Sequence, residues 1–214
     1  MRVRHIMSTP VVSVPSNTPV LEAAKLMKEK NIERLPVVDK DKLKGIVTKD
    51  RVLRSSPSAA TSLSIWEIQY LYAKLTVKDI MQKDVATVTP DTTIENAVRY
   101  AQEKRVGALP VLDEGKLVGI VTTNDFFYMI LNPILGIGEA GSRIIVRHCE
   151  TTPEIASAFQ CVADNGFHVV NASYFKSRRG EERDLIIHVR EEDTTKLAEC
   201  MRDKCHLQAE TRDR

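Results

Sequence analysis

The 214-residue sequence contains no long hydrophobic run. Its most apolar stretch, 126–138, is interrupted by Asn132 and Pro133, whereas a transmembrane helix needs about 18 or more apolar residues. The first residues lead into Ser, Thr and Pro, which is not the pattern of a secretory signal peptide. We therefore expect a cytoplasmic protein with no membrane span and no membrane partner.

Cysteine is absent from the first 148 residues and occurs only four times in all. Without a secretion signal, we expect these side chains to be free thiols in a reducing cytosol. No metal site is predicted, because the chain has no C-x-x-C pair and no H-x-x-x-H on one helix face. The cysteines and the histidines near them are Cys149, Cys161, Cys200, Cys205, His148, His188 and His206.

The sequence also lacks an excess of charge of one sign, with 31 Lys and Arg against 29 Asp and Glu. This balance argues against a nucleic-acid partner or an anionic membrane surface. It has no G-x-S-x-G, no Walker loop and no Cys/His pair in a supporting context, so we predict no enzyme and no required cofactor. The 43% of apolar residues is nevertheless enough for a core, which excludes global disorder.

An internal repeat appears when the sequence is shifted by 74 residues against itself. Leu35-Pro36-Val37-Val38-Asp39 aligns with Leu109-Pro110-Val111-Leu112-Asp113, and 42–48 aligns with 116–122. About eighteen of forty-eight aligned positions are identical without a gap, which chance does not produce. The first two thirds of the chain is therefore a tandem duplication, repeat 1 at 1–54 and repeat 2 at 77–132.

Each repeat has the pattern of a short strand, a helix, two strands and a helix (β-α-β-β-α). In repeat 1, 19–30 has apolar residues at helical spacing after a candidate N-cap, Thr18. Strands are predicted at 34–39 and 43–48. Repeat 2 has a helix capped by Asp91 or Thr92 and ending at Gln102, then strands at 108–112 and 116–122. One small unit cannot bury both faces of a three-stranded sheet, so we expect the two to pack sheet to sheet.

After the repeats, 133–141 is rich in turn formers and is predicted as a linker. Strands are predicted at 142–149, 168–176 and 184–190, the last two around a charged hairpin at 177–182. Helices are predicted at 153–164 and 194–204, with a short tail at the end. The order of elements is β-α-β-β-α-β.

The runs LPVVDKDKLKGIVT and LPVLDEGKLVGIVTTND resemble the cystathionine-β-synthase (CBS) domain motif, and two copies in tandem resemble a Bateman module over 1–132. The segment 142–214 resembles the ferredoxin-like ACT domain. The insert 55–76, with a predicted helix at 65–75, is similar to that of acetoin-utilisation regulatory proteins. The resemblance implies an α/β (α+β) chain: a tandem CBS pair plus a C-terminal ACT-like domain.

The CBS resemblance implies an adenine nucleotide (AMP, ADP or ATP) or S-adenosylmethionine in the cleft between the repeats. Thr122 and Asp125 match the G-h-h-T-x-x-D pattern, in which the carboxylate accepts hydrogen bonds from ribose and the threonine suits a phosphate. Asp125 is equally suited to capping its helix, and Arg34 to being a solvated charge. The expected nucleotide-binding residues are Thr122, Asp125, Thr48, Arg34, Val11, Val12, Val85, Ala86, Leu35, Pro36, Ala108, Leu109 and Pro110.

Two positions depart from the family patterns. Arg51 stands in repeat 1 where the ribose-binding carboxylate is expected, which predicts one tight nucleotide site per chain, at Asp125. Glu154 follows Pro153 where ligand-binding ACT domains carry glycine, and its side chain places a negative charge in the way of a ligand.

These observations predict a non-enzymatic regulatory sensor that signals through conformation or oligomerisation. Two alternatives stay open: a regulatory subunit of an acetoin-utilisation-type catalytic partner, and a structural dimerisation module without a ligand. Homodimerisation is expected because Phe126, Phe127, Met129 and Ile130 crowd one short helix. Trp66, Tyr70 and Tyr72 resemble a platform for base stacking, but Trp66 and Tyr70, at helical spacing, are more compatible with one apolar face that covers the cleft or a dimer partner.

Overall fold

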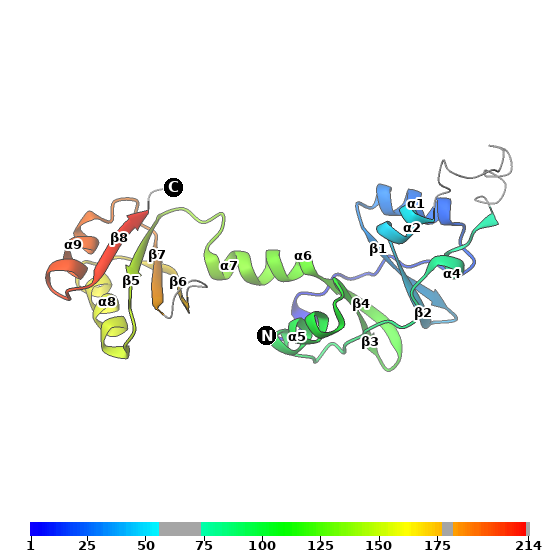
Figure 1. Ribbon diagram of the computed structural model, residues 1–214, viewed down its shortest axis with the longest axis horizontal. Helices are drawn as coiled ribbons and strands as arrows, with labels where there is room; N and C mark the ends of the chain where they lie inside the picture. The colour runs from blue at the N-terminus through cyan, green and yellow to red at the C-terminus, as the bar shows by residue number, and fades with distance from the viewer. Residues whose placement is uncertain (56–73, 177–181, 213–214) are drawn as a thin grey trace. The chain divides into compact units, whose positions relative to one another are not determined.

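The computed structural model describes residues 1–55, 74–176 and 182–212. The chain divides into two compact units, Met1–Phe126 and Phe127–Arg214 (Figure 1). Trp66, Tyr70 and Tyr72 lie outside the described residues, as do most of the predicted helix 65–75 and of the hairpin turn 177–182. Within the described ranges, no helix is both long enough and apolar enough to cross a membrane.

Repeat 1 forms α1 (Val20–Glu29), β1 (Arg34–Asp39), β2 (Lys42–Thr48) and α2 (Lys49–Arg54). The two strands pair antiparallel through a two-residue turn whose residues, Lys40 and Asp41, both have positive φ. That conformation matches the twist of a hairpin. Repeat 2 forms α5 (Ile94–Lys104), β3 (Ala108–Asp113) and β4 (Lys116–Thr122) in the same way, so the predicted helix and hairpin of each repeat are confirmed.

The N-terminal segment of each repeat packs on the other repeat. The Val3 N–H, in the short helix η1 (Val3–His5), donates to the Thr92 carbonyl of repeat 2 at 2.9 Å. The Val77 N–H, in α4 (Val77–Ile80), donates to the Thr18 carbonyl of repeat 1 at 2.8 Å. Val77 is completely buried in the core of repeat 1. The two folded halves of the first unit are therefore not the two halves of the sequence duplication.

This exchange explains why each first helix starts later than predicted. Thr18 and Asp91 or Thr92 were the expected caps, but the N-caps are Pro19 and Thr93. The Val20 N–H donates to the Leu75 carbonyl, and the Ile94 N–H donates to the Met1 carbonyl, in both cases from the exchanged segment. A tertiary hydrogen bond therefore sets the first helical residue, where sequence propensity alone favours an earlier start.

The predicted first strand of each repeat is reduced to isolated bridges. Val14 pairs parallel with Val37, and Val88 with Val111, so the sheets β1-β2 and β3-β4 have two strands each. Ser8 pairs instead with Ile120 of repeat 2. The chain between Ser8 and Val14 has to cross from one sheet to the other, and it cannot continue either ladder while doing so.

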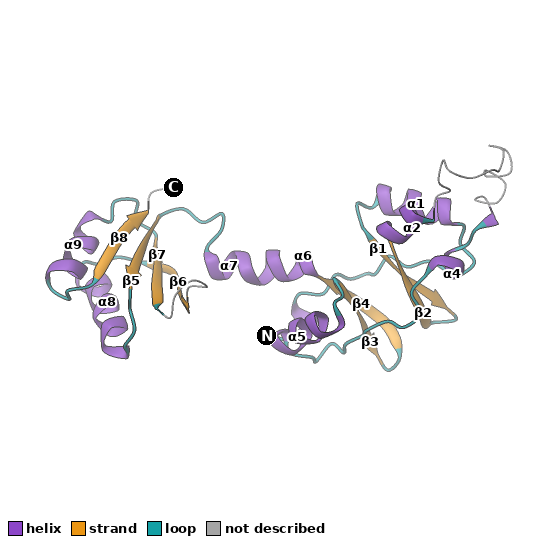
Figure 2. Ribbon diagram, in the orientation of Figure 1, coloured by secondary structure: helices purple, strands orange, loops and turns teal. Residues whose placement is uncertain are grey.

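The helix after β4 extends beyond the point where the sequence predicted a linker. It runs through α6 (Thr123–Phe126), the π-helical turn η2 (Phe127–Leu131) and α7 (Asn132–Leu135), as Figure 2 shows. Pro133 lies in the first turn of α7, directly after the π-helical turn. Gly136 ends the helix in the left-handed conformation, with φ of 60°.

The second unit consists of β5 (Ser142–Arg147), α8 (Thr152–Asp164), β6 (Val169–Lys176), β7 (Arg183–Val189), α9 (Thr195–Asp203) and β8 (Gln208–Arg212). The predicted β-α-β-β-α-β order is confirmed, and the C-terminal tail is the last strand. The strands form one antiparallel sheet in the order β6-β7-β5-β8. Both helices cover the same face, because α8 and α9 share one core with alternate residues of the strands (Figure 1).

The segment after α7 is bound to the opposite face of this sheet. Arg143 of β5 donates from Nη2 to the Leu135 carbonyl at 3.0 Å and to the Gly136 carbonyl at 2.9 Å. The fully buried His188 of β7 places Nε2 3.0 Å from the Ala140 carbonyl. These contacts make the predicted linker residues part of the second unit.

The expectation of four free thiols is wrong for two of the cysteines. Cys161 of α8 and Cys200 of α9 form a disulfide, with their Cα atoms 5.9 Å apart. Cys149 is buried and Cys205 half-buried, and both are free thiols. The pair was missed because its members are 39 residues apart in the sequence, and only the packing of two helices on one sheet face brings them together.

The exchanged segments predict that Gly45→Ala is destabilising. A Cβ at Gly45 would lie 2.7 Å from the Gln82 carbonyl oxygen, in the backbone that bridges to Ile46. We expect the free energy of unfolding to fall by about 1–3 kcal/mol, measured by denaturant titration. At the equivalent Gly119 the nearest atoms to a Cβ belong to the Met7 side chain, which can move more easily than backbone, so Gly119→Ala should cost less. Equal, negligible effects at both positions would contradict the exchange.

The first turn of α8 predicts a loss of stability in acid. The Glu154 carboxylate accepts hydrogen bonds from the N–H groups of Thr151 and Glu150, both at 2.8 Å. The bonds from Thr151 are the main cause that lowers the pKa of Glu154 below its ordinary value of 4.5. This stabilisation is therefore fully present above about pH 4.5 and is lost as the pH falls through the lower, folded-state pKa.

Glu154→Gln should accordingly lower the melting temperature at pH 7 and flatten its dependence on pH, with the two curves converging in acid. Thermal unfolding between pH 7 and pH 2.5 measures both effects. Glu199→Gln, which changes an exposed carboxylate of α9, is the control and should leave the profile close to wild type. A parallel loss of stability for Glu154→Gln and wild type at every pH would contradict this account.

Candidate functional site

Two clefts in the first unit are lined by residues of both repeats. The larger, of about 240 Å³, contains five of the expected residues and is called here the Asp125 cleft: Val11, Val12, Arg34, Thr122 and Asp125. The smaller, of about 180 Å³, contains five as well and is called the Thr48 cleft: Arg34, Thr48, Val85, Ala86 and Ala108. The 74-residue shift relates the two clefts, so they are equivalent positions in the duplication.

Asp125 follows β4 and lies in the first turn of α6. Its Oδ2 accepts hydrogen bonds from the Thr122 N–H and from the Thr122 hydroxyl, both at 2.7 Å. Its Oδ1 accepts a longer hydrogen bond, at 3.3 Å, from the hydroxyl of Ser8. Asp125 therefore caps the turn with one oxygen. The other oxygen, Oδ1, can accept further hydrogen bonds, and Asp125 is one of the residues that line the cleft.

Arg51 occupies the equivalent position in repeat 1 and behaves differently. Its backbone N–H donates to the Thr48 hydroxyl oxygen at 3.3 Å, so Thr48 caps α2. Its guanidinium Nη1 donates to the Ile80 carbonyl at 3.1 Å and so binds the exchanged segment. None of the described residues lining the Thr48 cleft is a carboxylate, and two of them, Arg34 and Arg105, are cationic.

Arg34, at the start of β1, lines both clefts. Its guanidinium lies against Gly107 of repeat 2, where a Cβ would come within 2.5 Å of Nη2. Glycine at this position therefore leaves the space that the guanidinium uses. Because the equivalent residue in repeat 2 is Ala108, the pair of clefts has this cation only once.

The segments 11–12 and 85–86 carry unpaired backbone at the cleft edges. Both lie outside the strands, and among the described residues their N–H and C=O groups make no hydrogen bond to other backbone. Their side chains are half-buried. This is the arrangement that an edge-on contact with a planar heterocycle such as adenine requires, because such a ring has both donors and acceptors on its rim.

Four expected residues are not brought to either cleft. Leu35, Pro36, Leu109 and Pro110 are buried within β1 and β3 and are absent from the lining of both clefts. The Pro36 and Pro110 carbonyls accept the Val14 and Val88 N–H groups, which joins the incoming segment to each hairpin. These residues hold the fold together.

Further apolar residues line the clefts, and the sequence analysis missed them. Ile32 and Ile120 line the Asp125 cleft, and Val106 and Ile46 line the Thr48 cleft. The repeat itself carried the signal, since Ile32 aligns with Val106 and Ile46 with Ile120. Ser8 had no such signal, because only the exchange of N-terminal segments brings it beside Asp125.

A model of the CBS domain matches residues 3–58 and 77–132, which together exceed half of the chain. The chain therefore belongs to the CBS-domain family and contains a tandem CBS pair. It is 36% identical over 132 residues to inosine-5'-monophosphate dehydrogenase from Korarchaeum cryptofilum (strain OPF8), covering 61% of this chain and 25% of that enzyme. It is 30% identical over 124 residues to CBS domain-containing protein YhcV from Bacillus subtilis (strain 168), covering 58% of this chain and 81% of that protein.

Solved structures of CBS pairs share this fold. The CBS domain pair of protein MJ0100, in complex with 5'-methylthioadenosine and S-adenosyl-L-methionine, has a TM-score of 0.51 at 28% identity and covers 62% of this chain and 97% of its own. CBSX2 in complex with AMP has a TM-score of 0.51 at 30% identity, covering 61% and 96%. A putative acetoin utilization protein (AcuB) from Vibrio cholerae has a TM-score of 0.53 at 27% identity, covering 62% and 91%.

The predicted tandem CBS pair is thus confirmed. Two of the solved CBS pairs hold adenosine-containing ligands, AMP in one and 5'-methylthioadenosine with S-adenosyl-L-methionine in the other. The matched residues end at 132, so the resemblance of the second unit to an ACT domain stays a prediction. The matched segment is only a quarter of the dehydrogenase's own length.

Proposed function

We propose that this chain is a non-catalytic regulatory protein that binds an adenosyl ligand in the Asp125 cleft. One observation carries the proposal: a carboxylate, a threonine hydroxyl, a guanidinium and unpaired backbone from both repeats line the same cleft. CBS pairs of similar fold hold AMP in one case, and 5'-methylthioadenosine with S-adenosyl-L-methionine in another.

Each part of the ligand has a partner of matching chemistry. Oδ1 of Asp125, which accepts only the long hydrogen bond from Ser8, has the capacity to accept hydrogen bonds from ribose hydroxyls, and the backbone at Val11 and Val12 meets the rim of the adenine ring. Ile32 and Ile120 contact the ring faces. Arg34 and Thr122 favour a phosphate group, so AMP, ADP or ATP suits this cleft better than S-adenosylmethionine.

Residues of both repeats line the Asp125 cleft, and this suggests how ligand binding is converted into a conformational signal. A ligand that contacts both repeats shifts the equilibrium between their relative arrangements only if it binds one arrangement more tightly. The exchanged segments carry that shift directly, because Ser8 belongs to repeat 1 but pairs with β4 beside Asp125. Binding at Asp125 therefore acts on the connection between the repeats.

The two clefts should bind nucleotide unequally. Asp125 presents an acceptor to ribose, whereas Arg51 is a donor bound to the Ile80 carbonyl. Each charge-assisted hydrogen bond is worth about 1.5–3 kcal/mol. Losing one or two weakens binding roughly tenfold to several-hundredfold or more. Calorimetry with AMP, ADP and ATP should show one tight site per chain.

Asp125→Ala should abolish this tight binding, and the matched variant Arg51→Ala should leave it close to wild type. Because Asp125 also caps α6, Asp125→Asn is the more conservative companion, and a thermal melt of each variant without ligand controls for folding. Two equal sites per chain, or tight binding that survives Asp125→Ala, would contradict the proposal. Failure of every adenosyl compound to raise the melting temperature would favour a purely structural module instead.

We further propose that the second unit is an ACT-like, cytoplasmic signalling domain without an amino-acid ligand. The Glu154 carboxylate already accepts hydrogen bonds from the N–H groups just before α8, where a ligand would approach.

A regulatory subunit for a separate catalytic partner is the second candidate function of the chain, favoured by the similarity to an acetoin utilization protein. Retention of one catalytic protein on the immobilised chain, dependent on adenosyl ligand, would support it.

We propose homodimerisation as the mode of assembly. Phe127 and Met129, two of the four apolar residues expected to crowd one helix, have half of their surface exposed, at 50% and 52%. Light scattering at micromolar concentration should give twice the mass of a single chain, and Met129→Glu should shift the chain toward monomer. A strict monomer for the wild-type chain would exclude this assembly.

A further inference from the structure

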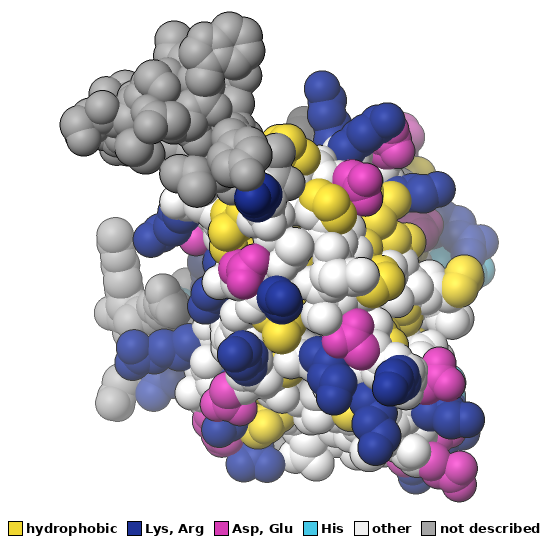
Figure 3. All heavy atoms as spheres, turned by 90° about the vertical axis from the view of Figure 1, so that its right-hand side faces the viewer, with side chains coloured by type: hydrophobic (Ala, Val, Ile, Leu, Met, Phe, Trp, Pro, Cys, Tyr) yellow, Lys and Arg dark blue, Asp and Glu magenta, His cyan; other side chains and the backbone are white. Residues whose placement is uncertain are grey.

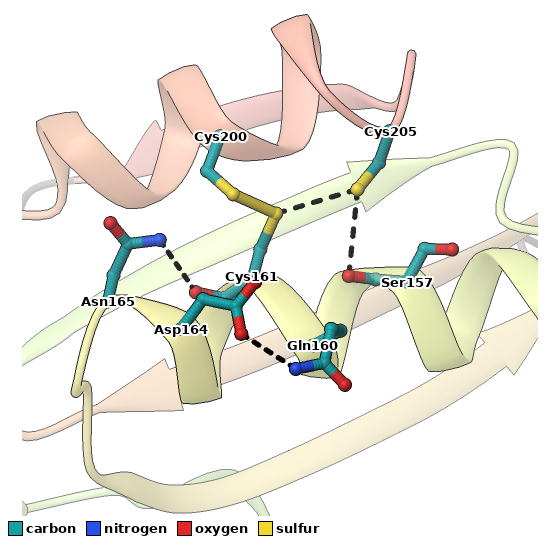
Figure 4. Close-up of a disulfide and its surroundings, with 7 residues drawn as sticks. All are labelled: Ser157, Gln160, Cys161, Asp164, Asn165, Cys200 and Cys205. Atoms are coloured by element: carbon teal, nitrogen blue, oxygen red, sulfur yellow. Dashed lines mark hydrogen bonds between the residues drawn. A yellow bond between two sulfur atoms is a disulfide. The ribbon is translucent and has the colours of Figure 1, made fainter.

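Three cysteine sulfur atoms meet where α8 and α9 pack against each other. Cys161 of α8 is bonded to Cys200 of α9, and the thiol of Cys205, just after α9, lies with its Sγ 3.5 Å from the Cys161 Sγ. In Figure 4 the Cys205 sulfur approaches Cys161 from the side facing away from Cys200. A thiolate that displaces one sulfur of a disulfide has to attack from that side.

The three sulfurs differ in their access to solvent. Cys161 is 2% exposed and Cys200 is 6% exposed, so both residues of the bridge are almost completely buried. Cys205 is half-buried, and its Sγ also lies 3.7 Å from the Ser157 carbonyl, which holds it against α8. Cys205 is thus in contact both with the bridge and with the surface.

The fourth cysteine provides a contrast. Cys149 is fully buried, and burial together with the charges of Glu154 and Glu150 raises the pKa of its thiol above the ordinary value of 9.0. A buried thiol that is reluctant to ionise is unreactive, because the thiolate is the nucleophile. Among the described cysteines, Cys205 is therefore the thiol placed for exchange.

We propose that Cys205 is a thiol–disulfide exchange site through which the buried Cys161–Cys200 bridge is opened and closed. The Cys205 thiol loses its proton to solvent, and its thiolate attacks the Cys161 Sγ. A Cys205–Cys161 bond forms while the Cys161–Cys200 bond breaks. The electron pair of the broken bond stays on Cys200, which takes up a proton, so the step needs no oxidant or reductant.

The exchange moves the disulfide to a sulfur that solvent can reach. A low-molecular-weight thiol such as glutathione then attacks Cys205, giving a mixed disulfide and a free Cys161 thiol. A second glutathione releases Cys205 as a thiol and leaves as oxidised glutathione. The net reaction reduces one protein disulfide and oxidises two glutathione molecules. This route gives the bridge that joins α8 to α9 a response to the thiol pool.

The first test measures how fast the bridge is reduced in the full-length oxidised chain. Glutathione is added, samples are alkylated at intervals, and mass spectrometry of the peptides follows the Cys161–Cys200 linkage. Cys205→Ser should slow reduction by more than about tenfold, because it removes the intramolecular nucleophile. Cys149→Ser is the matched control and should leave the rate unchanged. Melting temperatures of the oxidised variants check that each is folded.

A second variant tests the geometry independently of rates. In Cys200→Ser, Cys161 and Cys205 are the two cysteines left between α8 and α9. Oxidised glutathione should therefore give the folded chain a Cys161–Cys205 disulfide. Reduction of Cys205→Ser at the wild-type rate would overturn the proposal. So would the absence of a Cys161–Cys205 peptide from oxidised, folded Cys200→Ser, or four alkylated thiols in the oxidised wild-type chain.

Discussion

The exchange of N-terminal segments between the two repeats is the constraint on which the first unit depends. Each repeat lacks a piece of its own core, and the partner repeat supplies it: Val77 fills repeat 1, and Val3 is the equivalent residue packed on repeat 2. The clefts follow from the same exchange. Because Ser8 pairs with one sheet and Val14 with the other, the residues between them have to cross the junction, where Val11 and Val12 line the Asp125 cleft.

The sequence predicted the elements of this unit well and their partners poorly, for one physical reason. Apolar spacing and turn chemistry are local, and they placed the helix and hairpin of each repeat within one or two residues. The exchange is not local. Val3, Ile6 and Met7 recur as Val77, Ile80 and Met81, so either segment carries the side chains that either repeat needs. Because the core-facing residues of the two segments are identical, the sequence does not show which repeat each segment packs on, and this is evident only from the three-dimensional packing.

Several positions where the repeats agree hold the fold, and positions where they differ make the two clefts chemically unequal. The Leu-Pro pairs illustrate the first group: they looked like ligand contacts, yet their side chains are buried and the proline carbonyls accept the incoming segments. Two differences of the second group change the charged groups at the clefts. Asp125 in place of Arg51 gives one cleft a carboxylate acceptor for hydroxyl groups, while Arg34 lines both clefts and its equivalent in repeat 2, Ala108, supplies no second guanidinium at that position. Duplication supplies the architecture, and few substitutions then suffice to make the two sites unequal.

The second unit shows a signal that the sequence did contain. Cys161 lies on the same face of α8 as the buried Ala158 and Val162, and Cys200 shares a face of α9 with the buried Leu197 and Met201. In a β-α-β-β-α-β fold both helices cover one face of the sheet, so two cysteines on core-facing stripes are already candidates to meet. The spacing of the two cysteines along the chain does not show that they meet, because the fold determines which helix faces lie next to each other. Cys205 adds what periodicity cannot supply, since it follows the helix and reaches the bridge only through the path of the chain into β8.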